Sequence, residues 1–66
     1  MEVINSKALK DVMMTQCVGI VELARKAHLQ PYIVTKFTKA NCKARFSTVG
    51  RIAKALQIEP QTLLAE

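Results

Sequence analysis

The side chains best suited to chemistry in this sequence are cations. Four of them fall within residues 36–45, and between Glu22 and Glu59 the chain holds no acidic residue. This acid-free interval contains Arg25, Lys26, Lys36, Lys39, Lys43, Arg45, Arg51 and Lys54. Lysine and arginine bind phosphate and carboxylate groups by charge and by donating hydrogen bonds. A stretch of one sign on a folded domain therefore predicts an anionic partner.

The sequence holds few residues suited to catalysis or metal binding. The one histidine, His28, has no nucleophile at a useful spacing, and the chain has neither a carboxylate pair nor a glycine-rich loop. Cys17 and Cys42 are too few and too far apart for a metal site, so we expect two free thiols and no metal or cofactor. A chain of 66 residues also leaves little room for an enclosed pocket. These features predict that the protein is not an enzyme and has no small-molecule substrate.

Composition predicts one folded domain over residues 1–66. Half the residues are hydrophobic, and glycine and proline occur only twice each, which favours an all-α fold. The apolar runs are too short to cross a membrane, and the first residues lack the features of a signal peptide. We therefore expect a cytoplasmic protein with no membrane partner.

The hydrophobic spacing predicts a compact fold of five helices. Ile20, Leu23, Ala24 and Ala27 follow the spacing of one helical face, and Val49 to Leu56 repeats it. The expected helices cover residues 7–15, 20–27, 31–39 and 47–56, with a last one beginning at residue 60 and a connection over residues 40–46.

The second and third expected helices are separated by three residues only, His28, Leu29 and Gln30. Two short amphipathic helices joined in this way form a helix-turn-helix. Ala24 suits the point where the helices cross, and Leu29 suits a turn that folds back on the core. We expect a positive φ at His28, a position where glycine is usual.

The motif over residues 20–39 resembles the helix-turn-helix of the lambda-repressor/Cro (XRE) family of DNA-binding regulators. The matching residues are Leu23, Ala24, Ala27, Leu29, Val34 and Phe37, followed by the segments IAKAL at 52–56 and IEPQTLL at 58–64. The resemblance implies a five-helix lambda-repressor-like domain and a sequence-specific transcriptional regulator, a repressor that binds a palindromic DNA operator as a homodimer. An antitoxin or another protein-interaction module with the same fold is the alternative.

Several positions depart from the family pattern. Ile20 stands where the family often has a phosphate-binding glutamine, and His28 replaces the turn glycine. Thr38 stands where an acidic residue is common, and Met13 stands where some relatives have the arginine that pairs with that acid. Loss of both partners removes an ion pair without leaving one charge alone.

In this motif the N-terminal part of the third helix enters the major groove. The resemblance therefore implies base-reading roles on its exposed side for Gln30, Pro31, Tyr32, Thr35 and Lys36. It also places the following connection along the DNA backbone, which gives phosphate-contacting roles to Lys39, Asn41, Lys43 and Arg45. Solvated side chains are the alternative for the lysines. Ile33, Val34 and Phe37 are expected in the core, and residues 1–4 and 58–66 are candidate dimer interfaces.

Overall fold

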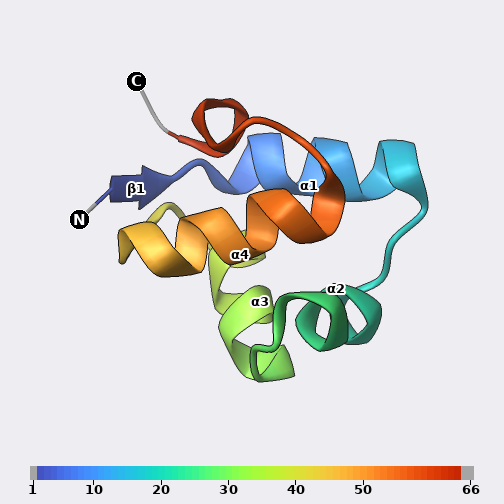
Figure 1. Cartoon of the computed structure of the whole chain (residues 1–66). Helices are drawn as coiled ribbons and strands as arrows, with labels where there is room; N and C mark the ends of the chain where they lie inside the picture. Colours follow the sequence, from blue (N-terminus) through green and yellow to red (C-terminus); the bar gives the residue numbers. More distant parts are fainter. Residues whose placement is uncertain (1, 65–66) are drawn as a thin grey trace.

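The chain folds into four α-helices, a two-stranded sheet and a final 3₁₀ turn, and the computed structural model describes residues 2–64 (Figure 1). The elements are β1 (Glu2–Ile4), α1 (Ser6–Gln16), α2 (Ile20–Ala27), α3 (Pro31–Lys39), β2 (Cys42–Ala44), α4 (Phe46–Leu56) and η1 (Pro60–Leu63). In Figure 1, α1 and α4 form the upper part of the molecule, and α2 and α3 form its lower end. Among the described residues, no helix is long and apolar enough to cross a membrane.

The prediction of an all-α, five-helix fold is wrong. Residues 2–4 and 42–44 form an antiparallel sheet in which Glu2 pairs with Ala44, Val3 with Lys43 and Ile4 with Cys42. Strands of three residues are shorter than usual and show almost no alternation, so their sequence resembles a loop. The expected fifth helix is also shorter, because Pro60–Leu63 is a single 3₁₀ turn.

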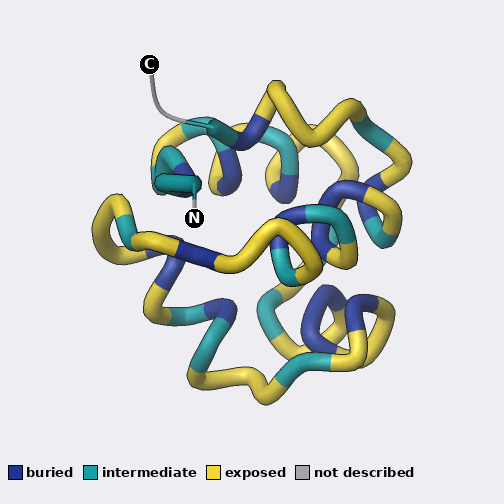
Figure 2. Tube along the Cα trace, turned by 60° about the vertical axis from the view of Figure 1, so that its left-hand side comes forward, coloured by how far each residue is buried: buried dark blue, intermediate teal, exposed yellow. Residues whose placement is uncertain are grey.

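The apolar residues that follow helical spacing in the sequence form the core. Leu23, Ala24 and Ala27 of α2 are at most 1% exposed, and α4 buries Val49, Ile52, Ala53 and Leu56. α2 packs against both α3 and α4, so α2 joins the lower and upper parts of the fold. Figure 2 shows that buried positions recur along the helices, while the connections between them are mostly exposed.

Three helices end on a left-handed residue that is not glycine. The residues are Cys17, His28 and Gln57, with φ values of 57°, 58° and 56°. In each case the next residue is apolar and its N–H donates to a carbonyl five residues back, at 2.8–3.0 Å, from Val18, Leu29 and Ile58. This pattern is the Schellman motif, which satisfies carbonyls at the helix end and turns the chain back towards the core. The positive φ predicted for His28 is confirmed.

Two asparagine side chains cap the start of α1. The Asn5 Oδ1 atom accepts from the backbone N–H groups of Lys7 at 3.0 Å and Ala8 at 3.2 Å. The Asn41 Oδ1 atom accepts from the N–H of Ser6 at 2.9 Å, across 35 positions of sequence. A helix begins with N–H groups that lack helical partners, and these bonds supply acceptors for three of them. The Asn41 bond also fixes the connection after α3 to the start of α1.

Candidate functional site

The α2–α3 unit is held by a turn of three residues. His28 adopts the left-handed conformation, and the Leu29 N–H donates to the Ala24 carbonyl at 2.8 Å. Leu29 is half-buried against the core, as expected for an apolar turn residue. Gln30 precedes Pro31, the first residue of α3, and makes no side-chain cap hydrogen bond. The turn therefore fixes the direction of α3 and leaves the Gln30 amide unoccupied.

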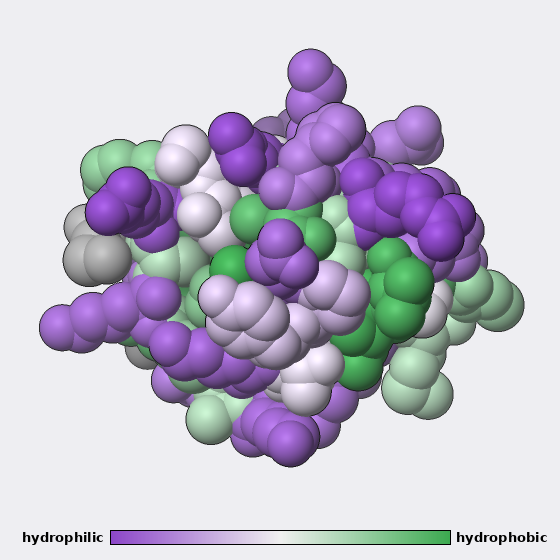
Figure 3. Space-filling view, turned by 90° about the horizontal axis from the view of Figure 1, so that it is seen from below, coloured by the Kyte–Doolittle hydropathy of each residue, from purple (hydrophilic) through white to green (hydrophobic). Residues whose placement is uncertain are grey.

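α3 has one buried face and one exposed face. Val34, Phe37 and Thr38 are buried, at 0%, 5% and 9% exposure. Val34 and Phe37 thus lie in the core as predicted, whereas Ile33 is only half-buried and packs at its edge. The predicted base-reading residues Gln30, Pro31, Tyr32 and Lys36 are exposed, and Thr35 is half-buried. Figure 3 views the α2–α3 end of the molecule, where hydrophilic side chains surround smaller hydrophobic patches.

The Thr35 hydroxyl group is not free to donate a hydrogen bond to a ligand. Its hydroxyl donates to the Pro31 carbonyl at 3.1 Å, one turn earlier in α3. The hydroxyl proton is therefore used within the helix, and the side chain presents its oxygen lone pairs and its methyl group. A methyl group in this setting can contact the thymine methyl, and the oxygen can accept from a base amino group.

A hollow of about 490 Å³ lies between α3 and β2. It is lined by Tyr32, Thr35, Lys36, Lys39, Ala40 and Cys42. The Cys42 thiol donates to the Lys36 carbonyl across 3.7 Å, a distance allowed for sulfur, and so joins β2 to the helix. Cys42 was not among the predicted site residues. The one feature of the sequence that could have indicated Cys42 is its position next to Lys43. Neighbouring residues of a strand point to opposite faces, so if Lys43 points to solvent, Cys42 points the other way.

The four predicted backbone contacts lie in one continuous segment after the exposed face of α3. Lys39 is exposed at the last position of α3, Lys43 in the middle of β2, and Arg45 just before α4. Asn41 differs, because its oxygen is held by the Ser6 N–H and only its amide NH₂ remains to donate. Asn41 thus combines a structural bond with its predicted role.

The charges of this segment are not neutralised within the chain. In the part of the chain that the structure describes, the ion pair present joins Lys26 to Glu22, at 3.6 Å on the surface of α2. Lys36, Lys39, Lys43 and Arg45 have no carboxylate partner among residues 2–64. Their charges therefore add together over α3 and β2, and they favour an anion outside the chain.

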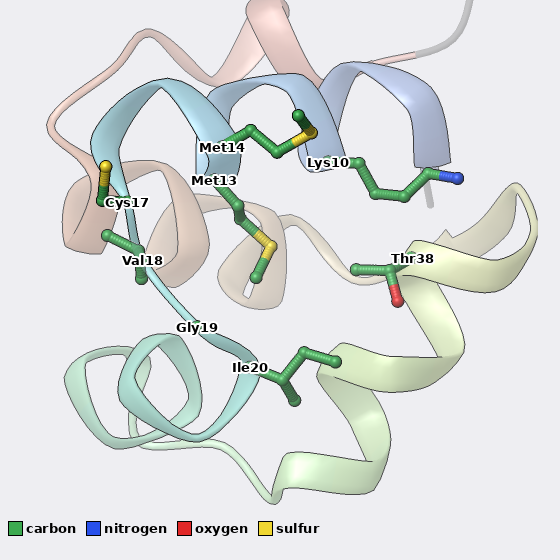
Figure 4. Close-up of a pocket in the computed structure, with 8 residues that line it drawn as sticks. All are labelled: Lys10, Met13, Met14, Cys17, Val18, Gly19, Ile20 and Thr38. Carbon is green, nitrogen blue, oxygen red and sulfur yellow. The ribbon is translucent and has the colours of Figure 1, made fainter.

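A second hollow, of about 440 Å³, lies on the other side of α3 and has an apolar lining (Figure 4). Its lining residues are Lys10, Met13, Met14, Cys17, Val18, Gly19, Ile20 and Thr38. Met13 points from α1 into the space between α1, Ile20 and Thr38. Met13 of α1 and Thr38 of α3 thus line the same hollow.

The cysteines and the histidine do not come together. Cys17 and Cys42 are both free thiols. Over residues 2–64, no group of three or more His, Cys, Asp and Glu side chains is arranged to hold a metal ion.

Comparison with known proteins gives a structural match but no family. No family model matches the sequence, and no curated protein matches it either. Among solved structures, the fold matches part of Streptomyces albus HEPD, solved with its substrate 2-hydroxyethylphosphonate and Fe(II) bound, with a TM-score of 0.85 and 23% sequence identity. The match covers 91% of this chain and 14% of that one. At this level of identity the likeness shows the fold alone.

The match corrects the prediction that the chain is not an enzyme. That prediction depended on the small size of the domain and on its lack of a catalytic constellation. The same fold, however, forms 14% of a chain that binds a substrate and Fe(II). Small size and a helical fold therefore do not separate this chain from enzymes.

Proposed function

We propose that this chain is a sequence-specific regulator of transcription that binds duplex DNA as a homodimer in the cytoplasm and acts as a repressor on a palindromic operator. The proposal is based on one observation. The exposed face of α3 carries groups able to read bases, and it continues into an acid-free segment of cations that have no carboxylate partner within residues 2–64. Its resemblance to lambda-repressor/Cro regulators supports the same reading.

The base-reading set lies in and just before the first two turns of α3. An α-helix fits into the major groove, and the N-terminal residues of such a helix reach the base edges. The Gln30 amide pairs with adenine, and the Lys36 ammonium donates to guanine. Tyr32 is 70% exposed and presents both an aromatic ring and a hydroxyl. Thr35 contributes its methyl group, since its hydroxyl proton is used by Pro31.

The backbone-contacting set follows directly along the chain. Lys39, Lys43 and Arg45 are exposed, and we propose that they bind phosphates on one side of the groove. Such contacts supply affinity and position without sequence information. If roughly four to six phosphates are neutralised per protomer, log K falls with log salt concentration with a slope of about −4 to −5 per protomer.

The small surface that one copy can bury on DNA supports binding as a dimer. A single small module buries roughly 600–1,000 Å² of protein surface on DNA, which is low for tight specific binding. Two copies related by a two-fold axis double this surface, and they place two α3 helices on two half-sites about one DNA turn apart.

The test is a selection of binding sites from random duplex DNA, repeated at several salt concentrations. We expect one enriched motif with internal two-fold symmetry and a steep salt dependence. Absence of an enriched motif at low salt would reject sequence-specific binding. Enrichment of a motif without symmetry would reject the palindromic operator and leave DNA binding itself in place.

A further inference from the structure

A third hollow, of about 310 Å³, lies between the end of α2 and α4. Two short segments of the chain line it, and their residues are Lys26, Ala27, His28, Arg51, Lys54 and Ala55. None of the four side chains that carry nitrogen here belongs to the base-reading set or to the backbone-contacting set. The proposed function therefore leaves this group of basic residues unused.

The packing of α2 against α4 brings these residues together. Arg51 and Lys54 are three positions apart, which places them on the same side of α4, and both are exposed. Ile52 and Ala53 lie between them in sequence and are buried in the core. Lys26 is exposed on α2, and α2 packs directly against α4. The core thus holds two polar helix edges at a fixed separation, on either side of the hollow.

The helix dipole accounts for only part of this cluster. Lys26 and Lys54 lie in the last turns of α2 and α4, where the negative end of a helix dipole favours a cation. Arg51 lies five residues before Leu56, the last residue of α4, and this interaction falls off within the last turn. A structural role at a helix end therefore does not explain why an arginine lines the hollow.

The carbonyl groups at the two helix ends beside the hollow already have donors. Each of four carbonyls accepts a hydrogen bond of 2.8–3.3 Å from a backbone N–H group just after its helix, and they belong to Ala24, Arg25, Ala53 and Lys54. An unpaired carbonyl oxygen at a helix end carries partial negative charge and repels an anion. Because these oxygens are occupied, the side-chain cations dominate the charge of the hollow.

The net charge of the hollow is positive even when its one neighbouring acid is counted. Over residues 2–64 no carboxylate lines it, and Glu22 reaches it only through Lys26, with which it forms a surface ion pair at 3.6 Å. About half of each of these two side chains is exposed, so the pair contributes little to stability. Lys26, Arg51 and Lys54 carry three positive charges and Glu22 carries one negative charge, and the difference is +2. The hollow therefore suits an anion with about two charges.

We propose that this hollow binds a small phosphorylated molecule, at a site separate from the proposed DNA-binding surface. A phosphate monoester carries roughly −1.5 to −2 charges at pH 7, close to the opposite of the charge of the hollow. The planar Arg51 guanidinium donates to two phosphate oxygens at once, and Lys26 and Lys54 attract the group as point charges. The volume of about 310 Å³ is at the lower end of the range of small-molecule sites, roughly 300–1,000 Å³, so the body of the ligand is small.

The first test is a titration of the full chain with glycerol phosphate at constant ionic strength, followed by backbone amide NMR signals. We expect saturable shifts at residues 26–28 and 51–55. Glycerate has a similar body and a single carboxylate charge, and we expect it to bind more weakly. Saturable shifts confined to residues 35–43 would overturn the proposal, because they would place the phosphate in the hollow between α3 and β2.

The second test removes the arginine. Arg51→Gln should weaken glycerol phosphate binding roughly tenfold, because the charge and the paired donors are both lost. Arg51→Lys keeps the charge alone and should fall between this variant and the native chain. The matched control is Lys36→Gln, which removes one exposed cation from the other side of the domain. Thermal denaturation checks that the variants fold. A loss of affinity in Lys36→Gln but not in Arg51→Gln would reject the site.

The third test predicts a gain of affinity. Glu22→Gln should strengthen glycerol phosphate binding by about two- to fivefold, because it removes the surface ion pair that competes for Lys26. A substitution that only disturbed α2 would not increase the affinity. Unchanged or weaker binding in Glu22→Gln would contradict the charge balance given above.

The last test separates a small ligand from the DNA backbone, which offers the same phosphate chemistry. We expect Arg51→Gln to leave the affinity for duplex DNA and its salt slope unchanged. A slope shallower by about one in this variant would assign a DNA phosphate to the hollow and would reject the small ligand. The first three tests contain no DNA, so a chain that selects no DNA motif would reject the proposed function without affecting this site.

Discussion

The two sides of α3 carry hollows of similar size that differ in the number of cations that line them. The hollow between α3 and β2 is about 490 Å³ and includes Lys36 and Lys39, whereas the one lined by Met13, Ile20 and Thr38 is about 440 Å³ and includes Lys10 as its one charged residue. Both linings are mostly apolar. The same short helix contributes to both hollows, with its lysines on one side and Thr38 on the other. Neither volume nor apolar lining distinguishes the two hollows, whereas the two lysines of α3 place positive charge on one side of the helix.

The largest expected change in free energy comes from a substitution in the core of α2. Leu23 is completely buried on α2, the helix that begins at the apolar hollow lined by Ile20 and ends at the turn into α3. Leu23→Ala should lower the free energy of unfolding by about 2–5 kcal/mol, through lost burial and the cavity left behind. Denaturant unfolding measures this change. A loss below about 1 kcal/mol would show that α2 is not a rigid support for either hollow.

The next effect should appear on the polar side of α3. Lys36→Ala should cost about 1–3 kcal/mol of binding to the selected motif and should relax the base preference at one position. Repeating the selection with the variant measures both changes, and Lys7→Ala, an exposed lysine on α1, serves as the charge-matched control. An unchanged motif would remove Lys36 from the base-reading set.

A smaller and less specific effect should follow from β2. Lys43→Ala should weaken binding to all sequences alike and make the salt slope shallower by about one, because one phosphate contact is lost. Titrations of one operator and one unrelated duplex at several salt concentrations separate this outcome from a change in specificity. A change in the preferred motif would move Lys43 from the backbone-contacting set to the base-reading set.

The smallest effect should come from the turn between the two helices. His28 has a φ of 58°, a conformation that costs a side-chain-bearing residue more than glycine. Because glycine also loses more freedom on folding, His28→Gly should raise stability by only about 0.5 kcal/mol, or roughly 2–4 °C in Tm. Thermal denaturation measures it. Lys26→Gly, inside α2, should destabilise by about 1 kcal/mol and provides the contrast.

Local patterns in the sequence were enough to predict the helices and the turn. The stripe of Leu23, Ala24 and Ala27 and the three-residue spacing before Pro31 are contained in short segments, and the structure has helices there. The positive φ at His28 follows from the same local geometry. The exposed side of α3 was also predictable, because a helix that buries Val34 and Phe37 must expose Lys36 and Lys39.

Features that depend on distant residues were not predictable. The sheet pairs residues 2–4 with 42–44, and neither strand is long enough to show a pattern. The Asn41 bond to Ser6 depends on the same pairing, and so does the place of Cys42 beside α3. The apolar hollow results from the packing of Met13, Ile20 and Thr38 from three different helices. The pairing of Ile4 with Leu64 likewise joins residues sixty positions apart, and no pattern in either segment indicates it.

The bridge between Ile4 and Leu64 joins the first strand to the end of the described chain. Residues near the two ends of the described chain lie side by side, although sixty positions separate them in sequence. Chains of this kind tolerate circular permutation, in which the ends are joined and new ones are opened at an exposed connection. New ends at Glu59, which is exposed between α4 and η1, would leave every α-helix uncut. We therefore expect a permuted chain, with its elements in a different order, to form the same arrangement in space.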